Sequence, residues 1–87
     1  MKLKLGQLVE VRWFDITSYP GWHSDDNWEV TECASVGFVV RETKIDLAIA
    51  QDMADINDET NEAEQCGNVM LIPKANIRRI KILRRVR

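Results

Sequence analysis

The fold is decided first by the stretch Leu8-Val9-Glu10-Val11-Arg12-Trp13-Phe14. Apolar and charged residues alternate along it, and its apolar members are mostly β-branched or aromatic. Alternation with a period of two is typical of a β-strand that has one face in the core and one face in water. We therefore expect a half-buried strand here, with Trp13 in the core.

Four further strands are predicted at residues 35–41, 45–49, 68–72 and 78–86. Gly37 lies inside the first of them, where a glycine predicts a β-bulge or a close approach between two backbones. Pro73 stops the third, and residues 73–77 fit a single 3₁₀ turn because proline fixes the entry and needs no hydrogen-bond donor. The pattern therefore indicates an all-β protein.

Residues 53–67 are acidic and carry few large apolar side chains, so we expect a mobile acidic loop there. A short helix at 48–56 is the alternative, because alanine and leucine favour helices. Five short strands, a long first loop and a 3₁₀ turn before the last strand together describe a small SH3-like β-barrel. An OB-type barrel is the competing fold, and it would place a helix in the acidic segment.

The totals indicate one soluble domain, residues 1–87. A domain of this size buries only about 60–65% of its unfolded surface, so oligomerisation is a common supplement to its stability. Neither a membrane span nor a signal peptide is expected, because no long apolar run occurs, and we place the protein in the cytoplasm. Cys33 and Cys66 are expected to be free thiols, and their spacing to His23 fits no zinc site, so no metal or cofactor is expected.

The net charge of −2 conceals two blocks of opposite sign. Residues 52–64 hold six carboxylates and no basic residue, whereas residues 74–87 hold seven basic residues and no acidic one. Such blocks indicate interaction surfaces, or simply a solvated loop and a solvated edge strand. They are also able to neutralise each other, within one chain or between the subunits of an oligomer.

Five of the six aromatic residues fall in residues 13–28, which we call the aromatic segment. Rings gathered beside short polar side chains in a loop are typical of a recognition site. The alternative is packing, with Trp13 and Trp28 in the core and Trp22 covering a loop. We predict a ligand-binding site formed with the strand at 35–37; its residues are Asp15, Ser18, Tyr19, Gly21, Trp22, Ser35 and Gly37.

The basic carboxyl-terminal strand is a second candidate site. It would follow phosphate groups through Lys74, Arg78, Arg79, Lys81, Arg84 and Arg85. The net negative charge of the chain opposes binding of a polyanion, and lysine and arginine also protect edge strands against aggregation. A third candidate, His23 with Asp25, lacks a nucleophile in any recognisable motif, so we expect no enzyme.

The order of several motifs resembles that of small uncharacterised proteins of bacteriophages and prophages. The matching residues are Gly6, Val9-Glu10-Val11, Trp13-Phe14-Asp15, Gly21-Trp22, Cys33-Ala34-Ser35-Val36-Gly37 and Ile72-Pro73-Lys74-Ala75-Asn76-Ile77-Arg78-Arg79-Ile80. The resemblance covers most of the chain except the acidic segment. It implies an SH3-like barrel and a phage accessory protein that acts in the cytoplasm of an infected bacterium.

Together these observations predict a non-enzymatic binding protein that forms homo-oligomers. The aromatic segment would hold a host protein or sequester a small nucleotide-like signal. A phosphate-bearing ligand further predicts that Arg12, Arg41 or Arg79 faces the aromatic segment, whereas a protein partner predicts exposed rings with no cavity beside them. The alternatives are a small barrel that binds nucleic acid and a structural phage component without a ligand.

Overall fold

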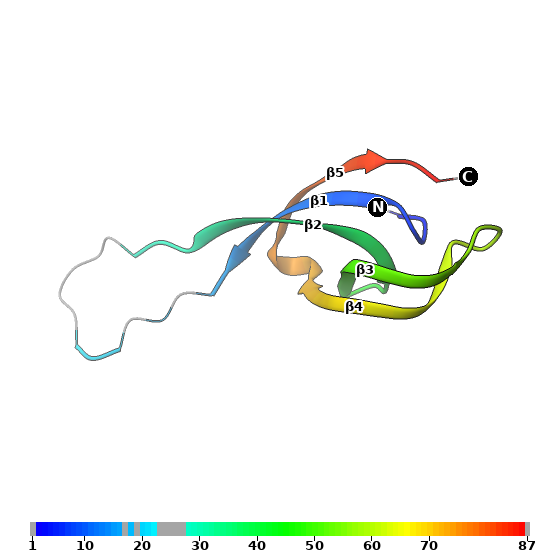
Figure 1. Cartoon of the computed structure of the whole chain (residues 1–87). Helices are drawn as coiled ribbons and strands as arrows, with labels where there is room; N and C mark the ends of the chain where they lie inside the picture. The colour runs from blue at the N-terminus through cyan, green and yellow to red at the C-terminus, as the bar shows by residue number, and fades with distance from the viewer. Residues whose placement is uncertain (1, 17, 19, 23–27, 87) are drawn as a thin grey trace.

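The structure is a computed structural model that describes residues 2–16, 18, 20–22 and 28–86. Its five strands are all antiparallel and form one sheet in the order β4-β3-β2-β1-β5 (Figure 1). The elements are β1 (Leu8–Asp15), β2 (Thr31–Glu42), β3 (Asp46–Asn57), β4 (Glu62–Pro73), the 3₁₀ turn η1 (Lys74–Asn76) and β5 (Ile77–Arg84). The all-β class and the 3₁₀ turn are confirmed. The sheet is open, because β4 and β5 lie at its two edges, and a closed barrel is not formed.

The core lies on one face of the sheet and follows from the alternation in β1. Val9 and Val11 are fully buried, and Leu47, Ile49 and Ile72 of the neighbouring strands are buried with them. Ile77, Ile80 and Ile82 of β5 pack against this cluster, and so does Trp13, whose place beside the core is therefore confirmed. Trp28 is not in the core, as the packing alternative placed it, because 46% of its surface is exposed.

Strand β2 changes its neighbours at Gly37. Its first residues pair only with β1, from Thr31 opposite Asp15 to Gly37 opposite Val9, and its pairing with β3 begins at Phe38. A Cβ atom added to Gly37 would lie 2.9 Å from the carbonyl oxygen of Ala50, so only glycine allows β3 this close. The predicted close approach is confirmed, and a register shift between Val39 and Arg41 follows it.

We expect Gly37→Ala to lower the free energy of unfolding by about 2 kcal/mol, because the added methyl group forces two backbones apart. Urea denaturation followed by tryptophan fluorescence measures this loss. Gly67→Ala is the matched control: its Cβ would lie 3.4 Å from the Cβ of Asp52, an ordinary contact. Its stability should change by less than about 0.5 kcal/mol. Equal losses in the two variants would contradict the role given to Gly37.

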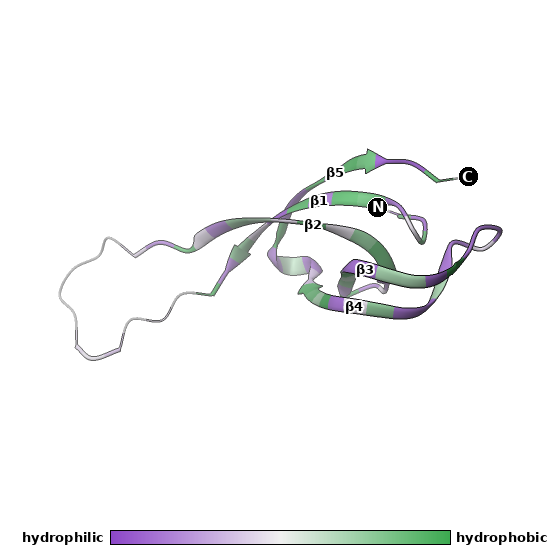
Figure 2. Cartoon of the chain, viewed as in Figure 1, coloured by the Kyte–Doolittle hydropathy of each residue, from purple (hydrophilic) through white to green (hydrophobic). Residues whose placement is uncertain are grey.

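The prediction of a loop at residues 53–67 is wrong, and so is the alternative helix at 48–56. Strand β3 continues to Asn57 and β4 begins at Glu62, so the segment forms a β-hairpin whose turn is hydrophilic (Figure 2). The Asn57 side chain accepts hydrogen bonds from the backbone N–H groups of Glu59 and Thr60 and thereby closes the turn. The backbone hydrogen bonds between β3 and β4 and the Asn57 side chain in the turn form this hairpin, although its residues show no apolar alternation.

Candidate functional site

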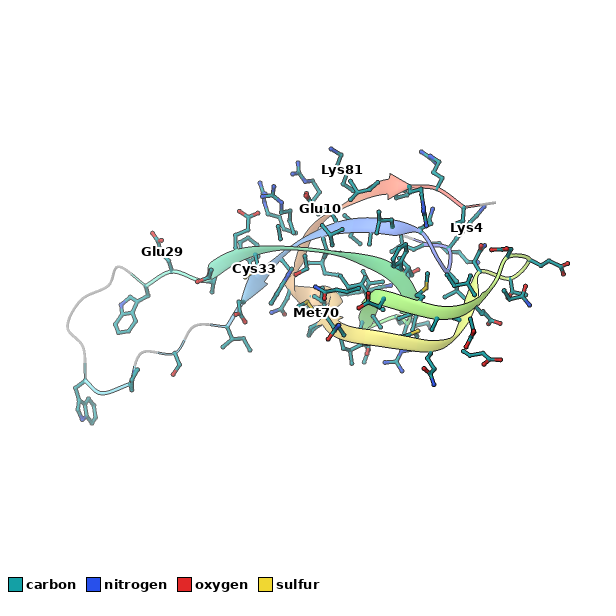
Figure 3. All side chains as sticks on the ribbon, viewed as in Figure 1. Lys4, Glu10, Glu29, Cys33, Met70 and Lys81 are labelled. Carbon is teal, nitrogen blue, oxygen red and sulfur yellow. The ribbon has the colours of Figure 1, made fainter. Side chains whose placement is uncertain are left out.

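Beyond Trp13, the last residue of β1 that pairs with β5, β1 and β2 continue as a two-stranded arm in which Phe14 and Asp15 pair with Glu32 and Thr31. It projects from the body of the sheet, and Glu29 lies beyond it at the end opposite to Lys4 (Figures 1 and 3). The described residues that connect the two strands of the arm, 16, 18, 20–22 and 28–30, are called the arm tip. The described residues of the aromatic segment that follow Asp15 therefore lie at the end of a projection (Figure 1).

Large apolar side chains are exposed at the arm tip. Trp22 is 102% exposed, Ile16 is 84% exposed and Val30 is 58% exposed. Gly21 precedes Trp22 with a φ of +91°, a conformation that glycine adopts without strain. None of these three side chains contributes to the hydrophobic core. Exposed apolar groups that the fold does not use indicate a surface for a partner.

Three predicted site residues have structural roles instead. The hydroxyl of Ser35 accepts a hydrogen bond from the indole N–H of Trp13 at 3.0 Å, and Gly37 is buried against β3. The carboxylate of Asp15 accepts the backbone N–H of Ile16 at 2.8 Å, which organises the end of β1. The structure therefore does not bring Ser35 and Gly37 together with Trp22.

The remaining predicted residues differ in what can be said of them. Ser18, Gly21 and Trp22 are exposed at the arm tip. Tyr19 lies outside the described residues, as do His23 and Asp25 of the hydrolase alternative. The part of the predicted site that the structure leaves open to a partner is thus centred on Trp22.

The hollow nearest to Ser35 has about 250 Å³ of space and lies where β2 turns away from β3. It is lined by Ala34, Ser35, Val36, Ile49, Gln51, Asn68 and Met70. No aromatic ring is among these residues, so this hollow offers no stacking surface for a nucleobase. Trp22 is not among the residues that line this hollow, so the two do not form one site.

Two of the three arginines expected to face a phosphate-bearing ligand are paired with carboxylates. Arg12 pairs with Glu10 at 3.2 Å, and Arg41 lies 3.9 Å from Asp46 near the far end of β2. Arg79 lies opposite Arg12 on β5, several residues before β1 reaches the arm tip.

The predicted basic edge is also divided. Lys74 forms an ion pair with Glu42 at 2.9 Å, and Arg78 forms one with Glu32 at 2.7 Å. The guanidinium of Arg84 lies 5.5 Å from the centre of the Phe38 ring. Arg79, Lys81 and Arg85 are exposed, and no ion pair within 4.0 Å is found for them among the described residues.

Sequence reasoning missed the exposed apolar residues of β4. Val69 and Leu71 are each 52% exposed and Met70 is 38% exposed, although the run was predicted as an ordinary barrel strand. A continuous apolar run that ends in Pro73 was the available signal, since proline within a sheet is confined to edge strands and strand ends.

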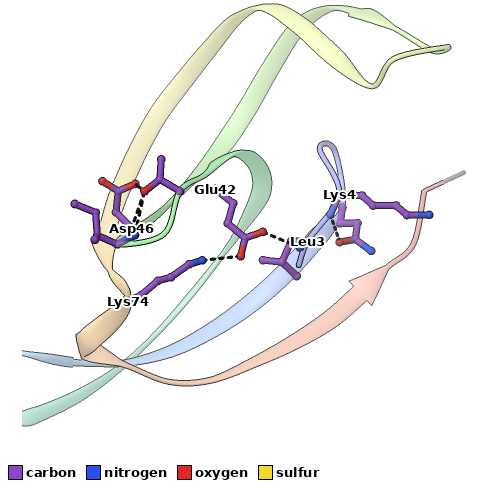
Figure 4. A network of polar contacts seen from close by, with 8 residues as sticks. Leu3, Lys4, Glu42, Asp46 and Lys74 are labelled. Atoms are coloured by element: carbon purple, nitrogen blue, oxygen red, sulfur yellow. Dashed lines mark hydrogen bonds and ion pairs between the residues drawn. The ribbon is translucent and has the colours of Figure 1, made fainter. Parts of the chain in front are cut away.

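A polar network connects η1 to the amino-terminal segment (Figure 4). The Glu42 carboxylate accepts the backbone N–H of Leu3 at 2.7 Å and the Lys74 ammonium at 2.9 Å. Burial raises the pKa of Glu42, but the hydrogen bonds from Leu3 and Lys74 together with the charge of Lys74 outweigh it, so the pKa lies below its ordinary value. Lys74 is therefore a structural residue.

We expect Glu42→Gln to lower the free energy of unfolding by about 1.5 kcal/mol at pH 7. The pKa of Glu42 is lower in the folded than in the unfolded chain, so this stabilisation is present above the unfolded pKa and is lost as the pH falls through the folded one. Urea denaturation measures the difference in free energy of unfolding between wild type and variant, and this difference should be smaller at pH 3 than at pH 7.

Glu32→Gln is the matched control for this prediction, because the Glu32–Arg78 pair is more exposed, 37% and 52%. Its loss at pH 7 should stay below about 0.5 kcal/mol. A Glu42→Gln gap of the same size at both pH values would contradict the role of the carboxylate charge.

Comparisons of this chain with protein-family models, with curated proteins and with solved structures gave no match. Among the described residues, the structure holds no group of three or more His, Cys, Asp or Glu side chains arranged for a metal ion. Nor does the described part of the chain contain a helix with the length and apolarity needed to cross a membrane. The arm tip and the sheet edges are the candidate sites of the described residues.

Proposed function

We propose that this chain is a non-enzymatic binding protein that recognises a protein partner through its arm tip. The observation that carries the proposal is Trp22, which is fully exposed at the end of a projecting two-stranded arm. A tryptophan offers a large rigid apolar surface, and such residues dominate the binding energy of protein interfaces. Ile16 and Val30 add further exposed apolar surface at the same tip.

A protein partner accounts for the arm tip better than a small nucleotide-like ligand does. A small ligand is held in a concave site that covers most of its surface. No hollow described in the structure is lined by Trp22, and Arg12 and Arg41 are paired with carboxylates. The resemblance to phage proteins makes a bacterial host protein the first class of partner to test.

The strand order and η1 support relating this open sheet to SH3-like folds.

We expect Trp22→Ser to weaken binding of the partner at least 10-fold, about 1.4 kcal/mol or more, because a central aromatic contact is removed. The free energy of unfolding should not change, since the side chain packs against nothing in the body. The partner is first captured from a bacterial lysate with the wild-type chain, then purified, and its affinity for each variant is measured by calorimetry.

Ile45→Ser is the matched control, because Ile45 is 75% exposed but lies in the turn between β2 and β3. It should bind the partner as the wild type does. Equal losses in both variants would contradict a site at the arm tip. A nucleotide that raises the melting temperature of the wild type but not of Trp22→Ser would instead favour the small-ligand alternative.

A further inference from the structure

We propose that copies of this chain associate head to tail, with the β4 edge of one copy paired with the β5 edge of the next. Both strands are edges of an open sheet: β4 pairs with β3 alone and β5 with β1 alone among the described strands. Edge strands present unpaired N–H and C=O groups, which are a template for another strand.

The β4 edge has backbone groups free to pair. Lys74 donates its backbone N–H to the carbonyl of Ile45 at 2.7 Å, which fixes the hydrogen-bonded pairs along β3 and β4. Because these pairs alternate in an antiparallel sheet, the N–H and C=O groups of Val69 and Leu71 point away from β3. Pro73 lies two residues after Leu71 and faces outward in the same way, so its missing N–H group is not needed for bonding to β3.

The β5 edge is open by the same reasoning. Val39 donates its N–H to the carbonyl of Gln7 at 2.8 Å, so the odd-numbered residues of β1 bond to β2 and the even-numbered ones bond to β5. Residues 79 and 81 of β5 therefore bond to β1. The backbone groups of Ile80 and Ile82 point outward.

Part of the β4 edge lacks the protection that edge strands usually have. Residues 65–72 contain no charged residue and no proline, and Val69 and Leu71 are both half exposed in this stretch. Natural sheets block such edges with charge, proline, bulges or a covering element. An apolar edge without these devices is stable in water when another strand covers it.

Charge selects β5 of a second copy as that strand. The only charged residues of β4 are acidic, Glu62 and Glu64, whereas all those of β5 are basic. Arg79 and Lys81 are exposed, and no ion pair within the chain is found for them among the described residues. Pairing β5 with β5 would bring like charges together, whereas β4 with β5 brings opposite charges together. Because this contact joins two different surfaces, each pair of copies still has a free β4 edge and a free β5 edge. Further copies are therefore able to add, and the assembly closes into a ring or extends as a fibre.

Analytical ultracentrifugation tests this pairing with two variants that each keep one edge intact. Leu71→Pro removes an outward donor from β4, and the double variant Arg79→Glu/Lys81→Glu reverses the charge of β5. Wild type at 100 μM should sediment as an assembly larger than a dimer. Each variant alone should be a monomer, because each has lost one of the two edges that every contact needs.

Mixing the two variants gives the decisive result. The intact β5 of the proline variant is able to pair with the intact β4 of the charge-reversed variant, so the mixture should form a 1:1 dimer and nothing larger. A dimer of the charge-reversed variant alone would overturn the proposal in favour of β4–β4 pairing. A monomeric wild type, or a mixture that stays monomeric, would overturn it as well.

Circular dichroism confirms that each variant is folded, and Val69→Lys replaces Leu71→Pro if the latter is not. Its matched control is Val36→Lys, since Val36 is exposed to a similar extent, 47% against 52%, but lies on β2, which is neither of the two proposed edges. Val69→Lys should be monomeric and Val36→Lys should assemble like the wild type. Equal sedimentation of the two lysine variants would overturn the proposal. A wild type that remains monomeric and binds single-stranded nucleic acid through Arg79 and Lys81 would overturn it as well.

Discussion

The approach of β3 to the backbone of β2 at Gly37 is the contact on which the rest of the structure depends. A side chain there would meet Ala50 and Ile49, so β2 and β3 would not join at this point. Because their pairing begins only beyond Gly37, the first half of β2 has β1 as its single neighbour, and beyond the last pair of β1 with β5, at Trp13, the two strands leave the body as an arm. Gly37 thus marks the point at which β2 gains its second neighbour.

The sequence predicts the strands that bury one face and fails on those that do not. Val9 and Val11 alternate with charged residues because one side of β1 faces the core, so the pattern reports the structure. In the β3–β4 hairpin, residues such as Glu62 and Glu64 are exposed, and no alternation marks them as a strand. Backbone hydrogen bonds and the Asn57 turn hold that hairpin, and these act on residue types that also occur in loops.

The sequence indicates the aromatic part of the candidate site but leaves its polar part open. The setting of Trp22 beside Gly21 and polar residues is compatible with a ring that covers the loop or one that faces solvent, and the structure exposes it. The side chains of Ser35 and Asp15 are equally able to bind a ligand or to accept a hydrogen bond from a neighbouring group. Which of the two they do depends on the register of the strands. Because Ser35 lies opposite Val11, the indole of Trp13 two residues further along β1 reaches its hydroxyl. Such a diagonal contact becomes visible only when the pairing of the strands is known.

The arm tip and the sheet edges together suggest why a small chain would carry both. A contact made by one tryptophan and a few aliphatic side chains is small, well below the roughly 800 Å² per partner of a standard interface, and is weak when made once. Head-to-tail pairing of β4 with β5 leaves the arm free, because the arm is built from β1 and β2 rather than from an edge strand. Each added copy then adds one more Trp22 to the assembly. Several linked weak contacts to a multivalent partner gain affinity through their high local concentration, so the acidic and basic edges would strengthen binding without contacting the partner.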